Sequence, residues 1–265
     1  MSEENGYWSY LATGIIFYSF GLKWCYDYAK LYYVPPKSRQ GRRDSPEHRG
    51  PLSQMKHGVS RMLNEHPIEG MLKLVATACG LLGILFTRTK ALDSQLVSPY
   101  VINATIYLFF ASSGLTDVLH FYFPLYVSEG LAKTALAQSF FVEGLFMWTE
   151  KYTNSFATSS STLSFIVWLS CISVALELVW PEMKLLSASL TLLHGTWIAH
   201  MIRMNGMEMI SQENVALIFS WHIAGASLMT LLVVSLTKAY LPREPPPPPR
   251  VPIYDFVNEM EIRNA

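Results

Sequence analysis

The fold is decided by residues 99–124, which read PYVINATIYLFFASSGLTDVLHFYFP. As a helix this stretch is long enough to cross a bilayer, which takes about 20 mostly apolar residues. Four polar side chains nevertheless share one face of it, because they follow i, i+3, i+4, i+7 spacing: Ser113, Thr116, Asp117 and His120. A charged group facing lipid costs about 2.5–3.5 kcal/mol on insertion scales. We therefore expect this face to contact other protein or a wet cavity inside a helical bundle.

The composition extends this interpretation to the whole chain. Of 265 residues, 51% are hydrophobic and 15% are charged, whereas about 25% are charged in a typical soluble protein. Apolar runs alternate with short polar segments, as in repeated membrane spans. We predict an all-α polytopic membrane protein, a single bundle of seven transmembrane helices within residues 1–240. The expected spans are residues 7–22, 67–86, 99–124, 130–148, 158–180, 184–204 and 214–238.

The orientation follows from the loop of residues 34–65. Eight lysines and arginines but only three acids lie between Lys30 and Glu65. The positive-inside rule places such a loop in the cytosol. The N-terminus is then lumenal or extracellular, and an odd number of spans puts the C-terminus in the cytosol. The same bases could also contact anionic lipid headgroups.

Residues 241–265 form a Pro-rich tail, which we expect to be cytosolic and without a folded structure of its own. An uninterrupted proline run favours the extended polyproline II conformation and acts as a stiff spacer. Within it, Pro245, Pro248 and Arg250 could also fit the groove of an SH3 domain. The motif that begins at Tyr254 and ends at Val257 resembles a tyrosine-based sorting signal of the type read by clathrin adaptors.

Ionisable side chains at membrane depth are candidates for function, and their positions along the spans define two layers. The first layer falls towards the cytosolic ends of the second, third and fifth spans: Glu69, Asp117, His120 and Glu177. The second falls in the middle or lumenal half of the fourth, sixth and seventh spans: Glu143, His194, His200 and His222. A polar cavity for a small ligand and simple hydrogen bonding between helices both explain such layers.

The sixth span carries polar residues on two sides. Ser187, Thr191 and His194 lie on one stripe, and a roughly opposite stripe contains Ser189, Thr196 and His200. We therefore expect this helix near the centre of the bundle. The second layer also suggests a zinc site with an open position for catalysis. However, His194 and His200 lie about 240° apart around a helix, so one ion could bind both only if the helix were broken there.

Known catalytic motifs give no further candidate. The sequence contains no CxxC, Walker, GxSxG, HExxH or GxGxxG pattern. We therefore assign no catalytic residue, metal or cofactor, and no nucleic-acid partner. The three cysteines fall in expected spans and are interpreted as small apolar packing residues.

Seven short motifs occur in an order that resembles the transmembrane protein 45 family, including its transmembrane epididymal protein branch. They are Gly14–Phe17 with Phe20–Trp24, Ile68–Gly70, Tyr107–Leu119, Phe141–Gly144, Leu176–Glu177, Gly195–Trp197 and Trp221–His222. The resemblance implies a seven-helix protein of intracellular membranes with no established catalytic activity. It also singles out Glu69, Asp117, Glu143, Glu177, Trp197 and His222 as shared residues.

This chain departs from the family pattern at several positions. It has Tyr10 and Thr13 where the family usually has His and Pro. Positions 194 and 200 are often Gln in the family, and Gln does not replace His as a metal ligand. The departures indicate a divergent member.

Two functional hypotheses follow. The first is a non-enzymatic multi-pass protein of the Golgi, endosome or lysosome, with the plasma membrane as the alternative location. It would act through partner proteins or a bound lipid-like or small ligand. The second is an intramembrane metal-dependent enzyme or transporter that uses the layer of Glu143, His194, His200 and His222.

Overall fold

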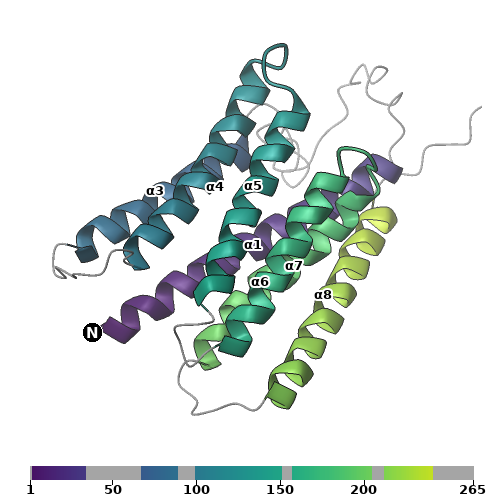
Figure 1. Cartoon of the computed structure of the whole chain (residues 1–265). Coiled ribbons are helices and arrows are strands. Elements are labelled where there is room, and N and C mark those ends of the chain that lie inside the picture. Colours follow the sequence, from purple (N-terminus) through teal and green to yellow (C-terminus); the bar gives the residue numbers. More distant parts are fainter. Residues whose placement is uncertain (1, 34–66, 89–98, 151–156, 205–211, 241–265) are drawn as a thin grey trace, which may run out of the picture.

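A computed structural model describes residues 2–33, 67–88, 99–150, 157–204 and 212–240 (Figure 1). These residues form seven α-helices and no strand, so the predicted all-α class is confirmed. The helices are α1 (Ser2–Tyr33), α3 (Ile68–Arg88), α4 (Pro99–Tyr122), α5 (Glu129–Glu150), α6 (Ala157–Leu176), α7 (Met183–Met204) and α8 (Gln212–Tyr240). Each of them covers all or most of one of the seven expected spans. The basic loop and the Pro-rich tail lie outside the described residues.

Two helices end earlier than predicted: α4 ends at Tyr122 instead of residue 124, and the larger difference is in α6. The fifth apolar run was expected to be helical up to residue 180, but α6 ends at Leu176. Pro181 has no backbone N–H, and its ring disfavours helical geometry in the residue before it. Glu177 therefore lies in the turn between α6 and α7, although its N–H still donates to the carbonyl of Ser173 at 3.1 Å.

The outer surface is unusually apolar. Four segments are long and apolar enough to cross a membrane, and they belong to α3, α4, α6 and α8. Their exposed side chains include Phe86, Leu108, Trp221 and Leu228, of which Trp221 is 72% exposed. Water-soluble monomers rarely expose apolar patches of this extent. These are the features of an α-helical membrane protein, and they support contact with the lipid bilayer.

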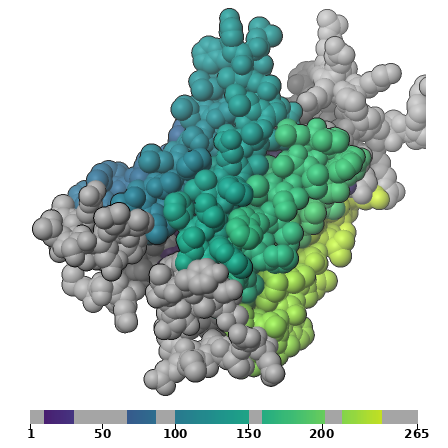
Figure 2. Space-filling model, in the orientation of Figure 1, coloured from purple at the N-terminus to yellow at the C-terminus, as the bar shows by residue number. Residues whose placement is uncertain are grey.

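The centre of the bundle is α7, as its two polar stripes predicted. It packs against α1, α6 and α8. In Figure 1, α3 and α4 lie on one flank and α8 on the other, and Figure 2 shows the same arrangement with side chains filled in. The stripe of Ser187, Thr191 and His194 is fully buried. The buried core also includes Phe17, Phe140 and Trp197.

Glycines bring α1 and α7 into backbone contact. A Cβ atom at Gly195 would lie 2.5 Å from the backbone nitrogen of Tyr18 and 2.6 Å from the carbonyl oxygen of Gly14. A Cβ atom at Gly21 would lie 2.7 Å from the backbone nitrogen of Leu192. Backbone atoms cannot swing aside as a side-chain tip can. Small residues that let helices approach closely are typical of membrane bundles.

The small residues of α3 allow close packing against α4. Gly70 and Gly114 let α3 and α4 pack closely, since a Cβ atom on either one would lie within 3.0 Å of the other's carbonyl oxygen. Gly80 packs against the ring of Tyr107. By contrast, a Cβ atom at Gly83 would meet no described atom within 4 Å.

The substitution Gly195→Ala should destabilise the protein by about 1–3 kcal/mol, because the added methyl group overpacks the α1–α7 contact. The matched control is Gly83→Ala, where a methyl group has room. The melting temperatures of the two purified variants in detergent measure the effect of each substitution. Equal melting temperatures for the two variants would contradict the proposed role of the glycine contact.

Candidate functional site

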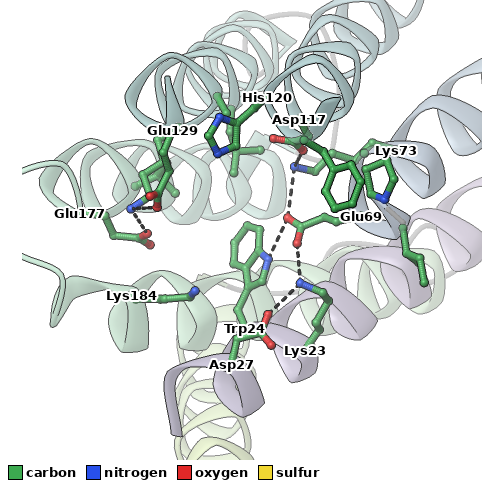
Figure 3. A pocket seen from close by; sticks show the side chains of 18 of the residues that line it. Lys23, Trp24, Asp27, Glu69, Lys73, Asp117, His120, Glu129, Glu177 and Lys184 are labelled. Carbon is green, nitrogen blue, oxygen red and sulfur yellow. Dashed lines mark hydrogen bonds and ion pairs between the residues drawn. The ribbon is translucent and has the colours of Figure 1, made fainter. Parts of the chain in front are cut away.

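A cavity of about 510 Å³ opens at one end of the bundle, where the ends of several helices meet (Figure 3). Its walls come from the C-terminal half of α1, the start of α3, the end of α4, the start of α5, the α6–α7 turn and the start of α7. Ten of its lining residues are ionisable: Lys23, Asp27, Glu69, Lys73, Asp117, His120, Glu129, Lys133, Glu177 and Lys184. The first predicted layer is thus brought together in one place.

One wall is a chain of five alternating charges that links α1, α3 and α4. The Nζ of Lys23 lies 2.8 Å from Asp27 Oδ2 and 2.7 Å from Glu69 Oε2. The Nζ of Lys73 lies 3.3 Å from Glu69 Oε1 and 2.7 Å from Asp117 Oδ2. Glu69 is therefore shared by two lysines, and Lys73 by two carboxylates. The indole Nε1 of Trp24 also donates to Glu69 Oε1 at 3.0 Å.

Lys73 is the most enclosed member of this chain, with 5% of its side chain exposed. An unpaired ammonium group would be very costly there, but two carboxylates and their hydrogen bonds compensate for lost hydration. Asp117 thus faces protein, as its place on the polar stripe predicted. Sequence reasoning missed Lys73 because it considered only acids and histidines. The i, i+4 spacing of Glu69 and Lys73 on one helix face was the available signal.

The opposite wall comes from α5, the α6–α7 turn and α7. Lys133 Nζ lies 3.0 Å from Glu129 Oε1 and 3.6 Å from Glu177 Oε2. Glu129 precedes the apolar part of α5, and the hydrogen bond from Lys133 is the main reason why its pKa lies below its ordinary value. Lys184 also lines this wall (Figure 3), and no carboxylate of the described residues lies within ion-pair distance of it.

His120 lies between the two walls (Figure 3). Its Nδ1 is 2.7 Å from the carbonyl oxygen of Val127 in the α4–α5 loop. Because a carbonyl oxygen only accepts, Nδ1 must carry the proton. This contact ties the end of α4 to the following loop and leaves Nε2 as the second polar atom of the ring.

The second predicted layer separates into two pairs. His194 Nε2 lies 3.3 Å from Glu143 Oε1, and the His194 ring stacks on Phe17 with centroids 4.2 Å apart. The rings of His200 and His222 lie 4.9 Å apart. Among the described residues, no group of three His, Cys, Asp or Glu side chains could hold a metal ion. The single four-residue site required by the metalloenzyme hypothesis is therefore not formed by these side chains.

The pair of Glu143 and His194 lies deep in the protein. His194 is fully buried, and 5% of Glu143 is exposed. Glu143 Oε2 and both ring nitrogens of His194 have no hydrogen-bond partner in the described part of the chain. Trp197, another predicted site residue, is also fully buried and donates from Nε1 to the Ser159 carbonyl at 3.3 Å. Trp197 therefore connects α7 to α6.

The predicted partner motifs of the tail lie outside the described residues. They comprise Pro245, Pro248, Arg250, Tyr254 and Val257.

A comparison of the chain with models of known protein families finds no match. The resemblance to the transmembrane protein 45 family depends on the motifs of the sequence itself.

The substitution Lys73→Met should cost about 3–5 kcal/mol of stability, because Asp117 loses its ion-pair partner in a largely buried place. Adding Asp117→Leu should recover part of this loss, since an apolar pair replaces the ion pair. Unfolding free energies of both single variants and the double variant form a thermodynamic cycle.

The control for this cycle is Glu182→Gln, which removes an exposed acid in the α6–α7 turn. We expect it to change stability by less than about 0.5 kcal/mol. If the two single losses simply add in the double variant, Lys73 and Asp117 are not coupled and the description of the wall is wrong.

Proposed function

We propose that the chain is a seven-span membrane protein with a lumenal or extracellular N-terminus and a cytosolic C-terminus. The helices α1, α5 and α7 are less apolar than the other four, but several of their ionisable groups contact neighbouring helices. Lys23 forms an ion pair with Glu69 of α3, and Glu143 of α5 lies 3.3 Å from His194 of α7, a contact that lacks hydrogen-bond geometry. The excess of lysine and arginine in residues 34–65 supports the orientation. In this orientation the charged cavity lies at the cytosolic end of the bundle.

We further propose membership of the transmembrane protein 45 family and residence in the Golgi, endosomes or lysosomes. The seven motifs in the same order support membership of the family. The candidate sorting signal in the tail supports the location. SH3-type and clathrin-adaptor proteins are the cytosolic partners that this tail fits, and other membrane proteins are the partners that its helices fit.

The proposed activity is binding without catalysis: the cavity holds a small polar or lipid-like ligand. The observation that carries this is a cavity lined by ten ionisable residues, one of which, Lys184, has no described carboxylate in ion-pair distance. Its volume lies within the range of about 300–1,000 Å³ that is typical of ligand sites. The alternative of a metal-dependent enzyme or transporter gains less support, because Glu143–His194 and His200–His222 form separate pairs.

Native mass spectrometry of the full chain released from mild detergent tests for a bound ligand. We expect a non-covalent adduct on the natural protein. Ala132 lines the cavity and is 7% exposed, so Ala132→Phe should fill the space and remove the adduct. The control Glu182→Gln should retain it. Equal adduct on Ala132→Phe, with an unchanged melting temperature, would contradict the cavity as the binding site.

The sorting motif makes a separate prediction. Tyr254→Ala removes the aromatic residue that a clathrin adaptor would bind. We expect the steady-state distribution of the protein to shift towards the plasma membrane, as measured by surface labelling of intact cells. Tyr240→Ala, a tyrosine at the end of α8 that lies outside the motif, is the control. An unchanged distribution for Tyr254→Ala would count against the sorting signal.

A further inference from the structure

The charges of the cavity do not balance. Its described lining contains five carboxylates and four lysines. Lys23 and Lys73 share three of the carboxylates, and Lys133 forms the described ion pairs of both Glu129 and Glu177. Each wall thus has more carboxylates than paired ammonium groups.

The excess charge is best located at Glu177. Its contact with Lys133 is long, at 3.6 Å, and Lys133 is closer to Glu129. Only 8% of the Glu177 side chain is exposed, so water screens it poorly. Lys184 lines the same side of the cavity (Figure 3), and its charge contributes, after the hydrogen bond from Lys133, to the lowered pKa of Glu129. The cavity therefore presents one weakly compensated carboxylate and, on the same wall, one ammonium group that has no ion pair among the described residues.

A ligand that matches this arrangement carries a positive and a negative group close together. A simple anion would suit Lys184 but would enter a cavity in which carboxylates outnumber lysines, and a simple cation would suit Glu177 but be repelled by Lys184. A dipolar molecule satisfies both. Primary ammonium and phosphate groups both form strong charge-assisted hydrogen bonds, to carboxylate and to lysine respectively.

The loops beside the cavity indicate where such a molecule comes from. In the α4–α5 loop, Phe123, Leu125 and Tyr126 are 53%, 95% and 86% exposed. This loop follows His120 and projects at the top of Figure 2. The α6–α7 turn, which contains Glu177, exposes Val179 and Trp180. Exposed aromatic and aliphatic side chains at span ends are typical of the interface between lipid and water.

Loops of this kind beside the cavity fit a position at the depth of the lipid headgroups. The side chain of Phe121 lines the cavity and is 40% exposed, so it adds apolar surface at the cavity. Apolar surface beside the opening suits the first part of an acyl chain. A water-soluble dipolar solute would not need it.

We propose that the cavity binds the headgroup of a phospholipid with a primary ammonium group, with the ammonium on Glu177 and the phosphate on Lys184. This deepens the proposed ligand-binding function and depends on it. The site selects a primary ammonium because its N–H groups donate to the carboxylate. A trimethylated ammonium, as in choline lipids, has no N–H to donate.

The test uses the full chain in detergent micelles with short-chain phosphatidylethanolamine or phosphatidylcholine as the probe. Apparent affinity is measured from the concentration dependence of the melting temperature. We expect phosphatidylethanolamine to bind about tenfold or more tightly than phosphatidylcholine, as the loss of a charged hydrogen bond predicts. Equal affinities would overturn the proposal.

Two substitutions assign the two ends of the headgroup. Glu177→Gln should abolish the preference between the lipids, and Glu182→Gln, in the same turn but outside the cavity lining, should preserve it. Lys184→Gln should weaken both lipids about tenfold, whereas Lys238→Gln, near the C-terminal end of α8 and outside the lining, should not. Unchanged binding in both Glu177→Gln and Lys184→Gln would overturn the proposal, and melting temperatures without lipid show whether each variant is folded.

A further probe separates a lipid from a free solute. Glycerophosphoethanolamine carries the same headgroup without acyl chains, and we expect it to bind at least tenfold more weakly. Equal affinity would identify a soluble ligand and refute the lipid source. If lipids show no preference but the natural protein still carries an adduct that Ala132→Phe removes, only this inference fails. If the adduct is also missing, the proposed binding function fails with it.

Discussion

The architecture depends on the pairing of charges that an apolar environment would otherwise exclude. Lys73 can remain almost fully enclosed because the carboxylates of Glu69 and Asp117 neutralise its charge. Glu69 also forms an ion pair with Lys23. Desolvation of these ions is costly, so each partner restricts where its neighbours can lie. Three helices that are distant in sequence are thereby held in one register at one end of the bundle.

Away from this end, helices pack through small residues and isolated hydrogen bonds. Gly14 and Gly195 allow the backbones of α1 and α7 to touch. Ser164 donates to the Gly144 carbonyl at 2.8 Å and Ser139 to the Phe109 carbonyl at 2.9 Å, which connects α6 to α5 and α5 to α4. Because the lipid side is as apolar as the helix surfaces, such close contacts replace the hydrophobic driving force of soluble bundles.

The two predicted polar layers differ in their chemistry. The first lines an open cavity and combines acids with lysines, which suits recognition of a charged ligand. The second consists of buried pairs, in which Glu143 meets His194 across the α5–α7 contact and His200 meets His222 across the α7–α8 contact. Each pair joins two helices. Contact between helices therefore explains why these polar side chains lie within membrane spans.

The sequence by itself determined the helical class, the approximate positions of the seven helices and the expectation that α7 is enclosed by other helices. Apolar runs and the spacing of Asp117 with Ser113 are local properties, and local properties can be read along a chain. Only the tertiary structure decided that Lys73, Lys133 and Lys184 join the acids in one cavity, and that Glu143 and His194 separate from His200 and His222. The reason is physical: helix periodicity gives the face on which a side chain lies, but the rotation and neighbours of each helix arise from packing among all of them.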